Sequence, residues 1–198
     1  MMPSFGSPND KPVAIRQERR SDVAARDSLL DAAFGPGRFA KTSERLREGR
    51  KPARGLAFVA RRGGHLVGTL RLWPVVTGTG HACLLLGPLA VAEEARCLGI
   101  GATLMRQALQ RAHRLGHRAV ILVGDAAYYS RFGFSAEKTG MLRMPGPYER
   151  DRLLACELVP GALTAARGTI AAAGPSPSRL SGLIDRIAGS QPPIGQPA

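Results

Sequence analysis

A loop with two glycines joins an apolar segment to an amphipathic one, and it limits most strongly what this chain can fold into. Residues 83–91 are almost entirely apolar and predict a buried strand. Residues 102–115 carry apolar side chains at spacings of three and four and predict a helix. Between them, Gly99 and Gly101 let the backbone come close to a ligand. Because the first N–H groups of a helix have no partner inside it, the loop predicts an anion site suited to a pyrophosphate.

The two common nucleotide-binding motifs do not fit this loop. A P-loop requires a Lys-Ser/Thr pair after its last glycine, whereas Ala102 and Thr103 follow Gly101. The dinucleotide fingerprint requires a third Gly or Ala where this chain has Leu104. Neither motif therefore accounts for the loop.

Three motifs together resemble the GNAT superfamily of N-acyltransferases. Arg-x-x-Gly-x-Gly at residues 96–101 resembles that superfamily's acyl-CoA loop. Leu-Gly-Pro-Leu-Ala-Val at residues 86–91 resembles its fourth strand, and Tyr-Tyr-Ser-Arg-Phe-Gly-Phe at residues 128–134 resembles its late helix-turn motif. Since the three motifs follow the superfamily's order and spacing, the resemblance is fairly specific, and it covers roughly residues 13–163.

The resemblance implies acetyl-CoA as the co-substrate and no metal ion. It implies that strand backbone pairs with the amides of the pantetheine arm and that loop amides hold the pyrophosphate. The cofactor-binding residues that it implies are Leu89, Ala90, Val91, Arg96, Cys97, Leu98, Gly99, Ile100, Gly101 and Ala102. It also makes Tyr129 the group that protonates the leaving thiolate, while Tyr128 occupies a position that packs. Pro88 has no N–H and suits a local break in the sheet where a cofactor could enter.

The order of the predicted elements indicates a mixed α/β sheet. The elements are a strand at 13–18, helices at 22–34 and 42–49, strands at 56–60, 65–75 and 83–91, the helix after the loop, a strand at 119–123, a short helix capped by Asp125, a strand from 134 and a last strand at 153–159. Because helices do not alternate regularly with strands, a purely parallel sheet is excluded. The resemblance implies a GNAT-like mixed, α+β-like sheet of six to seven strands flanked by about four helices.

One domain between two tails is expected. Residues 1–11 and 164–198 are rich in small residues and proline, so both predict disorder, and the domain is expected to span residues 12–163. No apolar run approaches the ~20 residues of a membrane helix, so no membrane partner is expected. Three cysteines without metal-site spacing favour a reducing, cytoplasmic location.

The favoured function is acetyl transfer from acetyl-CoA to a primary amine of a small molecule or peptide by direct attack. No general base is evident, because residues 83–86 are apolar and Glu93 and Glu94 follow the strand. A catalytically inactive acyl-CoA-binding sensor or interaction module therefore stays open as an alternative. Both a monomer and a homodimer fit the sequence.

The net charge of +13 raises a further alternative, an RNA- or ribosome-associated basic protein. The arginines are scattered, however, and aromatic residues make up only 5% of the chain, too few for an obvious base-stacking platform. Specific nucleic-acid binding is therefore not expected. A basic surface that attracts the phosphates of CoA or an acidic substrate is the better interpretation.

Overall fold

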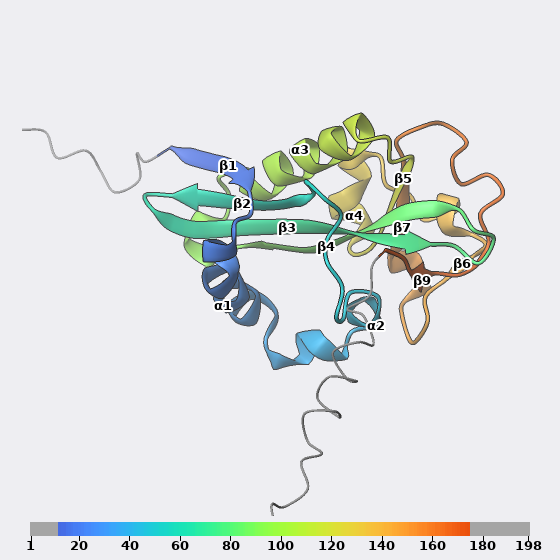
Figure 1. The fold of residues 1–198 in the computed structure, drawn as a ribbon, viewed down its shortest axis with the longest axis horizontal. Coiled ribbons are helices and arrows are strands. Elements are labelled where there is room, and N and C mark those ends of the chain that lie inside the picture. Colours follow the sequence, from blue (N-terminus) through green and yellow to red (C-terminus); the bar gives the residue numbers. More distant parts are fainter. Residues whose placement is uncertain (1–11, 175–198) are drawn as a thin grey trace, which may run out of the picture.

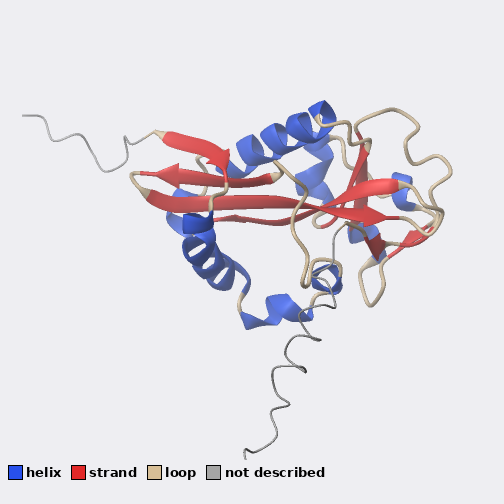
Figure 2. Ribbon diagram, in the orientation of Figure 1, coloured by secondary structure: helices blue, strands red, loops and turns tan. Residues whose placement is uncertain are grey.

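A mixed seven-stranded sheet forms the centre of the computed structural model, which describes residues 12–174 (Figures 1 and 2). The strands are β1 (Val13–Gln17), β2 (Ala57–Arg62), β3 (His65–Val76), β4 (Ala82–Val91), β5 (Ala119–Val123), β6 (Leu142–Arg143), β7 (Leu153–Glu157), β8 (Gly168–Thr169) and β9 (Ala171–Ala172). The α-helices are α1 (Val23–Phe34), α2 (Thr42–Arg45), α3 (Ile100–Arg114) and α4 (Ala126–Tyr129). Short 3-10 turns are η2 (Arg20–Asp22), η3 (Pro36–Ala40), η4 (Glu93–Ala95), η5 (Ser130–Phe132), η6 (Glu137–Thr139) and η7 (Arg150–Arg152).

The strands lie in the order β1-β2-β3-β4-β5-β7. Neighbours along this path are antiparallel except β4 and β5, which are parallel. The seventh strand, β9, pairs with the end of β3, and β6 and β8 form a separate two-stranded sheet. The predicted mixed α/β sheet of six to seven strands with about four helices is confirmed.

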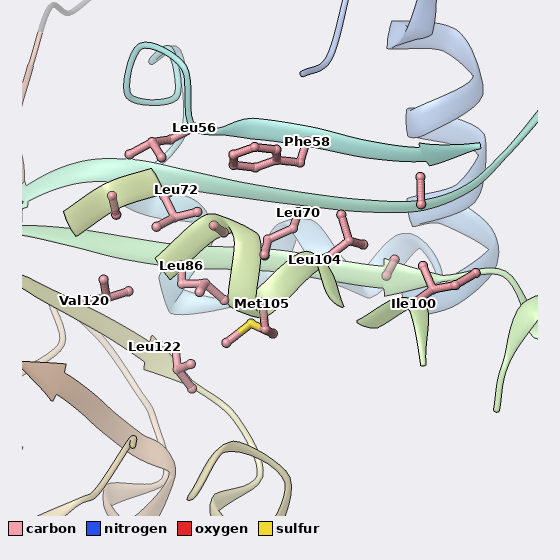
Figure 3. Close-up of a cluster of buried hydrophobic side chains, with 14 of the residues drawn as sticks. Leu56, Phe58, Leu70, Leu72, Leu86, Ile100, Leu104, Met105, Val120 and Leu122 are labelled. Carbon is pink, nitrogen blue, oxygen red and sulfur yellow. The ribbon is translucent and has the colours of Figure 1, made fainter. Parts of the chain in front are cut away.

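Helices cover both faces of the sheet, with α3 on one face and α1 and α2 on the other (Figure 1). The apolar stripe of α3 buries Leu104 and Met105 completely against Leu70 and Leu72 of β3 (Figure 3). Each large apolar side chain buried in this way stabilises the fold by roughly 1.5–3 kcal/mol. This packing fixes the first turn of α3 next to the end of β4.

Strands β4 and β5 stay paired over a short distance only. Their register joins Leu84 to Val120 and Leu85 to Ile121 and goes no further. On its other side, β4 pairs with β3 through Val91, with a register shift opposite Gly87 and Pro88. The second half of β4 therefore presents to β5 an edge without a strand partner, in agreement with the break suggested by Pro88.

The C-terminal boundary differs from the one expected. Residues 164–174 were expected to be disordered, but Ala166 is nearly buried, Ile170 is completely buried, and β9 pairs with Val75 and Val76 of β3. Ile170 joins the apolar cluster that contains Trp73. A single isoleucine in an Ala/Gly-rich stretch gives no periodic signal, so the expected boundary at 163 was wrong for this stretch. The expected tails at 1–11 and 175–198 lie outside the described residues.

Three predicted elements also differ in detail. The helix expected at 42–49 is reduced to the single turn of α2. The strand expected from Phe134 forms only an isolated bridge between Ser135 and Ala155. The last strand of the described chain is β9 and not the one at 153–159, which forms β7.

Candidate active site

A cavity of about 530 Å³ opens where β4 and β5 diverge. Its walls come from the second half of β4, the loop and first turn of α3, the end of β5 with α4, and the region of α1 and α2. Along the β4 wall, residues 86–91 have no strand partner on the side of β5. Backbone N–H and C=O groups at such an edge can pair with amides of an extended ligand, as a further strand would.

The loop before α3 places free N–H groups at one end of this cavity. Gly99 is the N-cap of α3 with φ of 70°, and the first helical bond runs from the Thr103 N–H to the Gly99 carbonyl at 3.0 Å. The first turn of α3 contains no acidic residue. The N–H groups before Thr103 and the positive end of the helix dipole are therefore available to an anion.

Cys97 in the same loop has an unusual backbone conformation. Its φ is 66°, and among residues 12–174 it is the only residue other than glycine with a positive φ. A residue held in this region costs on the order of 1–3 kcal/mol, and such residues cluster at ligand clamps and active sites. The conformation of Cys97 is therefore consistent with a loop shaped for a ligand.

The structure divides the predicted cofactor-binding residues into two groups. Leu89, Ala90, Val91, Arg96 and Gly101 line the cavity. The others do not line it: Cys97, Leu98, Gly99, Ile100 and Ala102. Cys97 and Leu98 are exposed and Ile100 is buried in the core, so in this second group only backbone groups are suited to a phosphate.

Tyr129 lines the cavity from α4. Its ring lies against Gly124, where an added Cβ would stand 2.3 Å from the ring, and it makes an edge contact with Phe134 at 6.0 Å between centroids. Burial, with a smaller contribution from Tyr128, raises the pKa of Tyr129 to about 12. The phenol therefore keeps its proton at neutral pH and can donate it. Asp125 caps this helix as predicted, accepting the Ala127 N–H at 3.0 Å.

Tyr128 does more than pack. It also lines the cavity, and its hydroxyl oxygen would lie 2.9 Å from a Cβ added to Gly101. The guanidinium of Arg131 stacks on its ring at 4.1 Å from the centroid. The hydroxyl therefore stands at the N-terminus of α3, and a side chain at position 101 would have to displace it.

Charged residues from η3, from α2 and from the turn that follows α2 also line the cavity, and the sequence did not single them out. Arg47 is 8% exposed, donates to the Ser43 carbonyl at 3.1 Å and pairs with Glu44 at 2.8 Å. Burial lowers the pKa of Arg47. Its Nη1 lies 3.8 Å from the position of a Cβ on Gly87, at the irregular point of β4. In the sequence, Glu44 and Arg47 are spaced like an ordinary surface ion pair, so no local signal distinguishes them.

Within residues 12–174, no group of three or more His, Cys, Asp and Glu side chains is arranged to hold a metal ion. In the same range, no helix has the length and apolar character needed to cross a bilayer.

Comparisons with known proteins agree with this geometry. A family model described as the acetyltransferase (GNAT) family matches residues 24–134. The uncharacterized N-acetyltransferase YhbS of Escherichia coli K12 is 31% identical over 157 residues, which cover 79% of this chain and 93% of that protein. The E. coli protein YjhQ, also named an uncharacterized N-acetyltransferase, is 30% identical over 133 residues, covering 65% of this chain and 72% of YjhQ.

Solved structures show the same relationship. The crystal structure of E. coli YhbS in complex with CoA has a TM-score of 0.72 at 29% identity, and the match covers 85% of this chain and 94% of that one. A GNAT family acetyltransferase from Brucella melitensis in complex with acetyl-CoA has a TM-score of 0.63 at 27% identity, covering 83% and 97%. Since the family model spans more than half of the sequence and the fold agrees, the chain belongs to the GNAT family of acetyltransferases.

Proposed function

We propose that this protein transfers an acetyl group from acetyl-CoA to a primary amine. The observation that carries the proposal is the meeting, in one cavity, of an unpaired strand edge and a helix N-terminus. The YhbS structure contains CoA and the Brucella structure contains acetyl-CoA, which supports acetyl-CoA as the donor here.

The cavity fits the two ends of the donor. The edge of β4 at Leu89, Ala90 and Val91 suits the amides of the pantetheine arm, which can pair with backbone as a strand does. The N-terminus of α3 suits the pyrophosphate. Arg96 adds positive charge, although its pairing with Glu93 at 3.5 Å and its exposure limit the energy that it can contribute.

The proposed reaction is direct transfer. The amine nitrogen attacks the thioester carbonyl carbon, the C–S bond breaks, and the leaving thiolate receives the proton of the Tyr129 hydroxyl. The Tyr129 phenolate then takes a proton from solvent water, because its raised pKa of about 12 makes it a strong base. Much of the rate enhancement is expected from holding the amine and thioester together.

The structure also offers a carboxylate for the proton that the amine loses. Two carboxylates line the cavity, Glu44 and Asp125. Asp125 accepts the Ala127 N–H and caps α4, whereas Glu44 belongs to α2, which lies on the face of the sheet opposite to α3. We therefore assign the role of proton acceptor to Glu44, a residue with no counterpart among the sequence-based predictions.

Acetyl transfer is tested by incubating the protein with acetyl-CoA and a panel of primary amines while thiol release and product mass are followed. An acetylated product that appears only with active protein supports the proposal. Tight acetyl-CoA binding without any acetylated amine would instead favour the catalytically inactive sensor.

Two glycine variants provide a matched test of the donor site. Gly99 and Gly116 lie at opposite ends of α3, both with positive φ and with open space where a Cβ would stand. Valine is strained equally at both positions, but only Gly99→Val places a side chain at the anion site. Gly99→Val should abolish the rise in melting temperature caused by acetyl-CoA, and Gly116→Val should retain it. Equal rises in both variants would contradict the donor site.

A further inference from the structure

A smaller cavity of about 260 Å³ adjoins the active-site cavity. Arg38, Glu44, Arg47 and Pro88 line both cavities, whereas the loop and first turn of α3 line only the larger one. If the donor lies along the β4 edge and α3, two regions remain for the acceptor. They are the smaller cavity and the wall between the two cavities. The chemistry of this region therefore identifies the acceptor class, and this inference rests on the proposed function.

We infer that the acceptor is a small primary amine that also carries a carboxylate. The size of the smaller cavity suits a molecule of amino-acid dimensions and not a folded protein or a polymer. Leu30, Trp73 and the more exposed Phe39 are among the lining residues and can contact a short carbon chain.

One carboxylate, at the junction of the two cavities, is placed to bind the amino group of the acceptor. Glu44 lines both, is 24% exposed, and has one oxygen 2.8 Å from Arg47. The second carboxylate of the smaller cavity, Asp27, already receives two hydrogen bonds from Arg26, at 3.0 and 2.8 Å. Each of the two carboxylates therefore has one oxygen bound to an arginine, but only Glu44 also lines the larger cavity, so Glu44 is the group placed to accept a hydrogen bond from an ammonium beside the β4 irregularity.

The positive charges differ in how far they are neutralised. Arg26 and Arg71 both pair with the buried carboxylate of Glu18. Arg38 uses its Nε to bind Asp31 at 2.7 Å, and within residues 12–174 its two Nη atoms have no hydrogen-bond partner. Lys41 contacts the ring of Phe34 at 4.9 Å and has no carboxylate partner in the described chain.

An anionic group on the acceptor would complete this arrangement. Arg38 is 14% exposed and stacks on Phe39 at 4.0 Å, so its guanidinium is held in place before a ligand arrives. A planar guanidinium with free Nη atoms binds a carboxylate well. A diamine or other cationic acceptor would instead place a second positive charge beside Arg38 and Lys41, which costs energy in a partly buried site.

The inference is tested with pairs of amines that differ by one carboxylate: glycine with methylamine, β-alanine with ethylamine, and 4-aminobutyrate with propylamine. The diamine 1,3-diaminopropane supplies the cationic arm. At fixed acetyl-CoA, kcat/KM of at least one carboxylated amine should exceed that of its partner and of the diamine by roughly tenfold or more, as expected for a charged hydrogen bond. Higher values for the uncharged or cationic compounds would overturn the inference and leave the proposed function intact.

Replacing Arg38 tests its contact with the acceptor carboxylate, because an effect on folding would change KM for both kinds of amine. Arg38→Gln should raise KM for the carboxylated amine roughly tenfold and leave KM for its uncharged partner unchanged. Arg114→Gln, at the far end of α3 and outside both cavities, is the matched loss of an arginine and should change neither value. An equal effect of Arg38→Gln on both amines would refute the role of Arg38.

Calorimetry of the same amines with the CoA-bound protein gives a readout independent of turnover. Selective binding of the carboxylated amines without acetylation would refute the proposed function and support the acceptor class. The absence of any preference for them in binding would refute the acceptor class whatever the outcome of the transfer assay.

Discussion

Replacing Tyr129 by phenylalanine separates catalysis from stability more cleanly than other changes at this site. Within residues 12–174 the Tyr129 hydroxyl has no hydrogen-bond partner, while its ring packs against Gly124 and Phe134. Tyr129→Phe keeps the ring and breaks no hydrogen bond, so the free energy of unfolding at pH 7 should change by less than about 0.5 kcal/mol. If the hydroxyl protonates the leaving thiolate, kcat should fall by roughly 10²-fold, which corresponds to about 3 kcal/mol.

The same variant should change the alkaline stability. Burial raises the pKa of Tyr129 from 10.0 to about 12, so the unfolded chain loses this proton at a lower pH than the folded protein. The associated stability is intact below pH 10 and is lost as the pH rises through about 12. A shift of this size corresponds to about 3 kcal/mol. Phenylalanine cannot ionise, so urea denaturation at pH 7, 10 and 11.5 should show a steeper loss of stability in the wild type.

Tyr128→Phe is the matched control, since it removes the same atom from the neighbouring residue. Its kcat at saturating acetyl-CoA should stay close to that of the wild type. If kcat falls in Tyr128→Phe and not in Tyr129→Phe, the motif is misaligned by one residue. If both variants keep full kcat, acid assistance by a tyrosine is wrong and positioning alone carries the reaction.

Three further substitutions test the loop, the C-terminal segment and the ion-pair network. Gly101→Ala should weaken acetyl-CoA binding measured by calorimetry, because its Cβ would lie 2.9 Å from the Tyr128 hydroxyl, and adding Tyr128→Phe should restore much of the affinity. Ile170→Ala should lower the free energy of unfolding in urea by roughly 2–5 kcal/mol, whereas Thr169→Ala, at an exposed position, should have little effect. Hydrogen bonds from arginine hold the pKa of buried Asp22 well below its ordinary value. Asp22→Asn should therefore lower the free energy of unfolding by about 3–5 kcal/mol at neutral pH. In denaturation curves, the difference in stability between wild type and variant should shrink as the pH falls below about 4.

The structural elements around the proposed donor site could be predicted from the sequence because their determinants are local. The glycines of the loop, the break at Pro88 and the start of α3 lie within some fifteen consecutive residues, and each acts through backbone geometry. The apolar stripe that seats α3 is also a local pattern, so the helix was predicted within two residues of its observed start. Backbone groups need only the right conformation, which residue types such as glycine and proline reveal.

The acceptor half could not be predicted in the same way. Arg38, Glu44 and Arg47 reach the cavity only because η3 and α2 fold back against Pro88, some forty residues later in the chain. Tertiary contacts hold this segment, including a hydrogen bond from the Thr42 hydroxyl to the Pro147 carbonyl. Charged residues in a short helical turn have the same appearance in sequence whether they face solvent or a substrate.

The two tyrosines of α4 show where a sequence motif stops being informative. Adjacent residues on a helix point about 100° apart, since a turn takes 3.6 residues. The ring of Tyr129 therefore lies against Gly124, whereas the Tyr128 hydroxyl reaches Gly101 at the start of α3. The motif aligns Tyr129 with the proposed acid, but only the tertiary structure shows that its neighbour shares the cavity. An identical side chain one residue away thus lies at the N-terminus of α3, where we propose that the pyrophosphate binds, and this makes the pair of hydroxyls a test of position and not of residue type.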